Sequence, residues 1–395
     1  MKRTSFVRLG FVAGLGFLAM SDWVVCAQAM TLPASQTYDA GIFGPLKVSG
    51  GIDGLFYATS GTGADSILHK DGEVNKSTGA LFKAFDVDIK KTTGQIRFRV
   101  EVKMSDSIYF GKLPREADFR AKSDSFTLSP VYMAYVTWAP TTNFNISVGQ
   151  IGSLLGYDSS DDWKNASIVD TPLYYTTNSS SRGIMTSYTL GNLSTTIAYG
   201  DGFDDGVWNV LQELVTYNFD SDNALSAYGL QTLGTKGPYT RAYGGGTNGT
   251  GYGGAAWVNN NVYGAYYSYT AGNLTLVPQV QYVYSKVVHR LDLDKTTSIF
   301  GAALEADYQF GNSPWSLGGN SFYYTSKGGT AWYMKPNSAG FGATITPSWI
   351  VGHVFIRGEG GLFHLTTMGT NTGGFGNYGT DRNQLLGLLE TGFVF

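Results

Sequence analysis

The chain contains a single cysteine, Cys26, among its 395 residues. A lone cysteine cannot close a disulfide within the chain, so cross-links do not stabilise this protein. Proline is also scarce, at 11 residues, whereas glycine reaches 53, tyrosine 26 and phenylalanine 23. Few prolines together with many glycines and aromatic residues are typical of a large all-β protein with many turns.

Long hydrophobic runs are missing as well. Beyond residue 29 no stretch reaches 18 apolar residues, which excludes transmembrane α-helices. Only a closed β-barrel could then cross a membrane, because lipid offers no water to unpaired backbone groups. The net charge of −3 is too mild to suggest nucleic acid as a partner.

The first 29 residues have the organisation of an export signal. A basic start is followed by an apolar run from Leu9 to Met20 and by the motif Ala27-Gln28-Ala29, which is typical of a cleavage site. The apolar run is too short to span a bilayer. We therefore predict that residues 1–29 are a cleaved signal peptide and that residues 30–395 form one exported domain.

A strand with two chemically different faces occupies residues 94–104, "GQIRFRVEVKM". Apolar side chains at even positions from Ile96 to Met104 alternate with Arg97, Arg99, Glu101 and Lys103. Successive side chains of a strand point to opposite faces, so one face is apolar and the other charged. A soluble sandwich would bury the apolar face in a core, and a membrane barrel would turn it toward lipid.

The spacing of the strands distinguishes these two folds. The pattern predicts about sixteen strands, near 46–59, 80–91, 94–105, 128–139, 143–151, 182–190, 192–200, 208–219, 222–233, 258–270, 273–286, 299–310, 315–326, 339–348, 350–364 and 384–395. Short links such as 92–93, 191 and 271–272 alternate with long ones such as 106–127, 152–181 and 234–257. Short turns at one end and long loops at the other are typical of outer-membrane barrels, with the short turns on the periplasmic side.

The end of the chain supports this fold. "QLLGLLETGFVF" places Leu385, Leu389 and Phe393 on one face and closes with Phe395. It resembles the C-terminal strand signal of Gram-negative outer-membrane proteins, which the outer-membrane assembly machinery would bind. We predict an all-β, closed antiparallel barrel in the cell outer membrane, with its apolar face against lipid.

A barrel of about sixteen strands leaves a water-filled channel, so selectivity must come from an inward loop and the charges that face it. The longest link, 152–181, is the candidate constriction loop. Arg97, Arg99 and Lys103 on the wall would face its acids and set a transverse field; an external, solvated loop is the alternative. The candidate pore-lining residues of the loop and wall are Asp158, Asp161, Asp162, Lys164, Asp170, Arg97, Arg99, Glu101, Lys103, Glu305, Asp307, Arg357 and Glu359.

The region from Asn145 to Asp205 resembles a known family. "NISVGQIGSLLGYDSSDDWKNAS" contains a strand ending in Gly149-Gln150 and then the step Gly156-Tyr157-Asp158, and "SRGIMTSYTLGNLSTTIAYGDGFDD" follows, opening with a strand at Arg182-Gly183. These motifs resemble the OmpL-like family of bacterial β-barrel porins. The resemblance implies a porin-like barrel of unassigned substrate.

Two classes of function remain open. The first is a porin that passes small hydrophilic solutes or ions by diffusion, without a cofactor or resident metal. The second is a barrel whose loops act as enzyme, adhesin or receptor; His353 shares a predicted face with Arg357 and Glu359 and could belong to a catalytic cluster. The aspartates at 158, 161 and 162 could also bind Ca²⁺, although they lack the EF-hand pattern. A homotrimer and a monomer both fit the sequence, and we favour the porin, which is not an enzyme.

Overall fold

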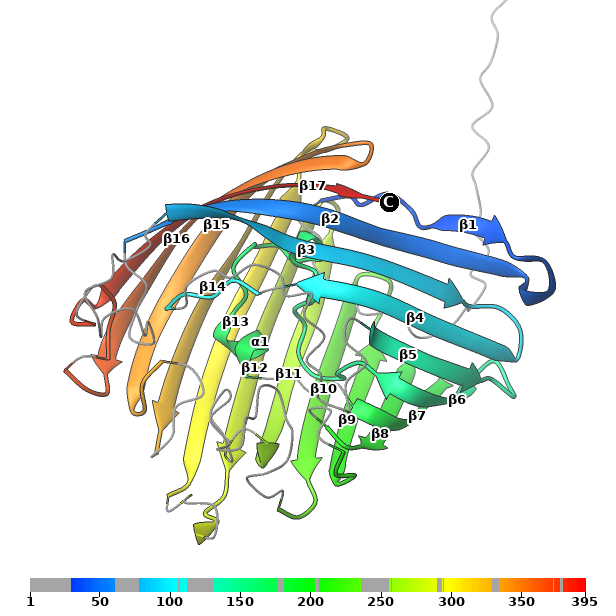
Figure 1. The fold of residues 1–395 in the computed structure, drawn as a ribbon, viewed down its shortest axis with the longest axis horizontal. Coiled ribbons are helices and arrows are strands. Elements are labelled where there is room, and N and C mark those ends of the chain that lie inside the picture. The colour runs from blue at the N-terminus through cyan, green and yellow to red at the C-terminus, as the bar shows by residue number, and fades with distance from the viewer. Residues whose placement is uncertain are drawn as a thin grey trace, which may run out of the picture.

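The computed structural model describes residues 30–60, 78–105, 107–111, 131–176, 181–202, 206–235, 256, 258–289, 293, 295–328, 334–371, 373–376 and 379–395. Among these residues no helix has the length and apolar character needed to cross a membrane. The sequence segments rich in alternating side chains all form strands, which close into a single ring (Figure 1).

Seventeen strands and three short helical turns are defined within the described residues. They are β1 (Gln36–Asp39), η1 (Gly41–Phe43), β2 (Pro45–Thr59), β3 (Thr78–Lys91), β4 (Ile96–Ser105), β5 (Val131–Trp138), β6 (Phe144–Ile151), η3 (Asp162–Lys164), α1 (Pro172–Tyr175), β7 (Ser181–Leu190), β8 (Leu193–Gly200), β9 (Val210–Asn218), β10 (Asn223–Thr232), β11 (Asn260–Ala271), β12 (Leu274–Ser285), β13 (Thr297–Gln309), β14 (Trp315–Lys327), β15 (Ser338–Val351), β16 (Val354–Met368) and β17 (Asn383–Val394).

The barrel itself consists of β2 to β17. Each strand pairs antiparallel with the next along the chain, from β2–β3 to β16–β17. Antiparallel pairing of β17 with β2, from Leu386↔Thr59 to Val394↔Gly51, closes the ring. The prediction of a closed antiparallel barrel with sixteen strands is confirmed.

Two local features differ from the sequence-based strands. β1 was not predicted; it pairs with the start of β2, where Gln36 lies opposite Val48, and continues the line of β17 beyond its end. The turn between β15 and β16 was expected at position 349, but it lies at 352–353. Gly352 adopts a φ of 62° there, and a left-handed residue of this kind favours a tight hairpin.

The two ends of the barrel differ as the sequence indicates. Short turns such as 191–192, 272–273 and 352–353 lie at the end where β2 begins and β17 finishes, and the longer connections lie at the other end. The connection 201–209 is shorter than its neighbours at that second end and was not among the predicted long loops.

The alternation in β4 sorts side chains as predicted except at Met104, which was expected on the lipid face but is buried. Ile96 and Val100 are exposed on the outer surface, at 55% and 36%, whereas Glu101 and Lys103 face inward and are buried. The last strand behaves alike: Leu385, Leu389 and Phe393 are exposed. An apolar exterior with an inward polar face is the arrangement that a lipid environment requires.

Candidate functional site: the interior of the barrel

The chain that follows β6 turns into the barrel. Residues 152–176 cross its interior, and α1 lies inside the ring of strands (Figure 1). Pro172 occupies the first turn of α1, where its missing N–H costs nothing. We call residues 152–176 the inner loop.

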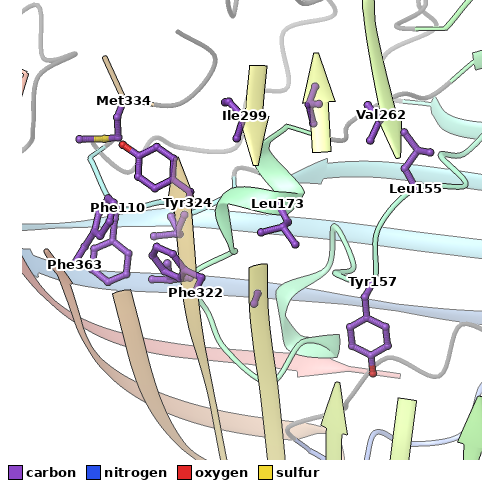
Figure 2. Close-up of a cluster of buried hydrophobic side chains, with 14 of the residues drawn as sticks. Phe110, Leu155, Tyr157, Leu173, Val262, Ile299, Phe322, Tyr324, Met334 and Phe363 are labelled. Carbon is purple, nitrogen blue, oxygen red and sulfur yellow. The ribbon is translucent and has the colours of Figure 1, made fainter. Parts of the chain in front are cut away.

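Apolar side chains attach the inner loop to one side of the wall. Leu155, Ile168, Val169 and Leu173 are buried and belong to one cluster with inward residues of β10 to β17. Leu173 lies against Gly301 of β13, and Figure 2 shows Leu155 near Val262 of β11. The interior is therefore not wholly polar, because part of it is a packed apolar core.

A second segment also enters the interior. Ile108 forms a parallel bridge with Val169 of the inner loop, and the Asp170 N–H donates to the Ile108 carbonyl at 2.9 Å. Phe110 packs against Phe322 and Phe363, with ring centroids 6.0 and 5.7 Å apart (Figure 2). The sequence did not single out residues 107–111, because they carry no charge pattern.

Asp161 lies between two lysines. It forms ion pairs with Lys103 of β4 and with Lys164, the latter at 2.7 Å. Burial alone would raise the pKa of Asp161, but the two ammonium groups outweigh it and lower the pKa below its usual value. The same pairing raises the pKa of Lys164. Asp161 is therefore ionised, its charge is balanced by the two lysines, and it attaches the inner loop to β4.

Asp162 has a different partner, Lys83 of β3, with which it forms a buried ion pair. A bulge explains why Lys83 points inward: Asp53 pairs with Ala84 and Gly54 with Phe82, so Lys83 is the extra residue. Glu390 of β17 lies 3.9 Å from the Lys83 ammonium.

Arg357 and Glu359 of β16 hold the backbone of the inner loop. Arg357 is fully buried and donates to the carbonyls of Asp162 at 2.7 Å and Asn165 at 3.0 Å. It also contacts Glu390 at 3.3 Å. Glu359 accepts the N–H groups of Ile168 and Val169, the latter at 3.1 Å. Both side chains fix the path of the loop.

Two more of the predicted pore-lining acids, Asp158 and Glu305, lie near β12. Gln279 of β12 donates one amide group to Glu305 at 2.7 Å and to Asp158 at 3.4 Å. Thr171 also donates to Asp158, at 2.8 Å.

Asp170 and Asp307 are both buried but lie apart in the chain. Asn165 donates to Asp170 at 3.2 Å. Burial, together with the nearby Asp158 and Asp162, raises the pKa of Asp170 well above its usual value. Asp307 faces inward on β13.

The wall bases of β4 divide into paired and less constrained groups. Arg99 binds Asp88 through two hydrogen bonds, at 3.0 and 2.8 Å, and Glu101 at 2.9 Å. Arg97 lines a cavity, and its Nε donates to the carbonyl of Gly94 within its own turn at 2.9 Å. The loop acids thus meet Lys83 and Lys103 in direct contact, rather than facing Arg97 and Arg99 across an open gap.

Several residues of this network were missed by sequence reasoning, notably Lys83, Asp88 and Glu390. For Asp88 and Glu390 the alternation of their strands was the available signal: Glu390 follows the outward Leu389. For Lys83 the signal was mixed: it is in phase with the buried Leu81 but out of phase with Asp88, because the bulge shifts the alternation between them.

His353 does not join Arg357 and Glu359. It lies in the turn 352–353, where Nδ1 is 2.8 Å from the Val394 carbonyl and the ring stacks on Phe393. The idea that these three residues share a lumen face is therefore wrong, since the turn begins three residues later than the sequence suggested.

Within the part of the chain that the structure describes, two groups of three carboxylates are close enough to consider metal binding. They are Asp53, Asp162 and Glu390, and Asp86, Glu101 and Asp161. In each group a lysine ammonium already contacts one member, Lys83 in the first and Lys103 in the second. The aspartates at 158, 161 and 162 face three different partners, so they do not converge on one ion.

A cavity of about 610 Å³ remains between the inner loop and the wall. Its wall residues come mainly from β3 to β9, and Leu32, Thr92 and Phe395 line it at the short-turn end. The packed apolar cluster lies mostly between the inner loop and β10–β17, and it meets the cavity at Leu155, Tyr157 and Tyr266. The open space of the barrel thus lies on one side of the inner loop.

Comparison with known proteins agrees with this architecture. The family described as "Putative beta-barrel porin-2, OmpL-like" matches residues 45–395. No curated protein matches the chain.

Solved structures show the same fold at low sequence identity. An anion-selective porin from Comamonas acidovorans superposes with a TM-score of 0.57 at 12% identity, covering 89% of this chain and 99% of that one. The outer membrane channel DcaP of Acinetobacter baumannii gives 0.54 at 12% identity, covering 92% and 100%. OmpT, an outer membrane protein of Vibrio cholerae, gives 0.53 at 13% identity, covering 89% and 97%.

Proposed function

Starting from the fact that the chain belongs to the OmpL-like beta-barrel porin family, we propose that it lets small hydrophilic solutes or ions diffuse passively across the outer membrane. The observation that carries this proposal is the cavity beside the inner loop, because it gives solute a polar space within a barrel whose exterior suits lipid. The barrel would hold this space open without a cofactor.

The inner loop is proposed as the constriction. It is anchored on β3, β4, β12 and β16 through Lys83, Lys103, Gln279 and Arg357, so its position is fixed from several directions. A fixed loop narrows the channel to the space between itself and β3–β9. Solute size would then be limited by this space and not by the full width of the barrel.

Recording in a planar lipid bilayer tests the proposal. Refolded residues 30–395 should give discrete conductance steps that grow with KCl concentration. Ser147→Trp places a large side chain in the cavity and should lower the conductance step. Ile146 precedes Ser147 on β6 and points outward, so Ile146→Trp should leave the step unchanged. A correctly folded barrel that never conducts would refute the porin.

The assembly role of Phe395 is likewise a proposal. Its N–H and carbonyl both pair with Gly50 at 2.9 Å, so the last residue completes the β17–β2 seam. We propose that the assembly machinery binds this terminal strand before the seam closes.

A further inference from the structure

The cavity beside the inner loop has two chemically different walls. Its charged side chains come from β3, from β4 and from the inner loop. The lining residues supplied by β5 to β9 are all uncharged. A solute that enters this space therefore meets uncharged side chains on the β5–β9 side.

Several of the charges on the other wall are paired. Asp88 is paired with both Arg99 and Lys90, at 2.8 and 3.0 Å, and Lys164 is paired with Asp161. Paired charges attract a free ion weakly, because their fields oppose each other over short distances. These pairs are thus poorly suited to select ions, whereas two lining bases at the short-turn end donate to neutral backbone carbonyls.

Tyrosine side chains from several elements contribute to the lining. Tyr132 and Tyr135 come from β5, Tyr174 from α1 and Tyr266 from β11. Tyr132 faces inward because a bulge makes it the extra residue between Met133, paired with Glu101, and Val131, paired with Val102. Opposite Tyr135 on β6 lies Gly149, which has no side chain to cover the phenol ring.

Hydroxyl groups complete the neutral wall. Thr137 and Ser147 share a hydrogen bond of 2.7 Å across β5–β6, and Ser187 and Thr196 share one of 3.1 Å across β7–β8. Each hydroxyl has one donor and two acceptor sites, so each pair keeps hydrogen-bonding capacity after bonding to its neighbour. All four residues line the cavity.

Aromatic faces beside hydroxyl groups fit one class of solute. The C–H face of a pyranose ring packs on a phenol ring, while its equatorial hydroxyls reach the groups around it. A space of 610 Å³ lies within the usual size of small-molecule sites. We propose that this cavity is a binding site for a neutral saccharide, with Tyr135 as a stacking platform and the Thr137–Ser147 pair as a hydrogen-bonding partner. This inference rests on the proposed porin function and names its solute class.

Current blockade by maltotriose tests the proposal with the refolded barrel. In 1 M KCl the sugar should interrupt the current transiently, with a saturable dependence on its concentration. Tyr135→Ala should raise the half-blocking concentration roughly tenfold, the loss expected for one aromatic contact of about 1.4 kcal/mol. Tyr308→Ala, an outward tyrosine on β13, is the matched control and should leave the blockade unchanged.

If Tyr135→Ala fails to fold, a second variant, Thr137→Val, and a second measurement still test the proposal. Thr137→Val keeps the shape of the side chain and removes its hydroxyl, and it should weaken blockade by several-fold. Binding of maltotriose to the detergent-solubilised barrel, followed by tryptophan fluorescence, should show the same ranking of variants.

The outcomes separate the two proposals. A barrel that does not conduct refutes the porin, whereas fluorescence would still report saccharide binding. A barrel that conducts but is blocked by citrate and not by maltotriose overturns the saccharide site in favour of an anionic solute. Equal blockade of the wild type and of both cavity variants would also overturn it.

Discussion

At the scale of single residues, the interior of this barrel is organised by ion pairs between the loop and the wall. Asp161 meets Lys103, and Asp162 meets Lys83. Removing one member of a buried pair leaves the other charge without compensation, which costs far more than an exposed pair contributes. These acids are therefore expected to fix the loop more than to select ions.

Asp161→Asn should loosen the inner loop. It leaves the buried Lys103 without its main partner, at a cost of roughly 3–5 kcal/mol. We expect faster hydrogen–deuterium exchange of amides 156–170, measured by mass spectrometry on the folded barrel. Asp158→Asn is the matched control, since Asp158 is held by Thr171 and Gln279 and not by a lysine. Equal exchange in both variants would contradict the anchoring role.

Asp170 gives a pH dependence. Burial and the neighbouring Asp158 and Asp162 raise the pKa of Asp170, so the folded chain holds its proton where the unfolded chain has lost it. This group then favours the folded state at low pH and loses that effect as the pH rises above about 4. Asp170→Asn stays neutral, so its gain in stability over the wild type should be larger at pH 8 than at pH 5. Urea unfolding at both values measures this, and a gain that shrinks with pH would exclude it.

Arg97 is the base through which selectivity should be adjustable. It lines the cavity near the short-turn end, and the bond that its Nε makes is to a neutral carbonyl. Arg97→Gln should shift the reversal potential in a KCl gradient toward cations. The shift should be smaller at 1 M salt, where the screening length is about 3 Å. Arg97→Lys keeps the charge and should behave like the wild type; a shift in this control would point to shape instead of charge.

At the scale of elements, each strand has a lipid face and an inner face whose tolerances differ. Val100 is exposed in the middle of β4. An arginine there should cost roughly 2–4 kcal/mol at the bilayer centre. Refolding of Val100→Arg into lipid vesicles, followed by the electrophoretic shift of the folded barrel, should be impaired, whereas Val100→Leu should refold normally. Normal refolding of both would reverse the assignment of faces.

The inner face is less permissive than alternation suggests. Alternation would class Glu101 as a wet position that accepts any charge, but its side chain is buried and paired with Arg99. A bulge adds to this effect in β3, because it turns both Lys83 and Ala84 inward. Bulges thus place functional side chains at points where the period of two is interrupted.

At the scale of the whole molecule, the inner loop links distant parts of the chain. Ser167 of the loop and Thr344 of β15 share a hydrogen bond of 2.9 Å. Ser167→Cys combined with Thr344→Cys should form a disulfide in the folded barrel, visible as an electrophoretic shift that reductant removes. The step conductance should be the same before and after oxidation, because the cross-link joins groups already in contact.

One control and two possible outcomes show how this experiment could contradict the prediction. Ser167→Cys alone should show no shift. Failure of the double variant to cross-link under oxidising conditions, in a barrel that is otherwise folded, would mean that the loop does not rest at β15. A large change in conductance on oxidation would mean that the loop moves during conduction.

The sequence by itself determined the barrel. Alternating side chains in segments such as 94–105 and 299–310 fixed strand positions and faces, because the period of two depends only on neighbouring residues. The apolar face and the sorted loop lengths then required closure in a membrane. The sequence of the loop 152–181 also indicated which acids could face the interior, although it did not indicate which residues they would contact.

Only the tertiary structure decided what those acids do. Lys83 and Glu390 are separated from Asp162 by long stretches of chain. A bulge at Lys83 also interrupts the period of two in β3. The cavity likewise forms because the inner loop packs most of its apolar side chains against β10–β17, while most of the cavity lining comes from the β3–β9 side. Contacts between residues so distant in sequence form only when the closed ring brings them together. Patterns among neighbouring residues therefore do not predict them.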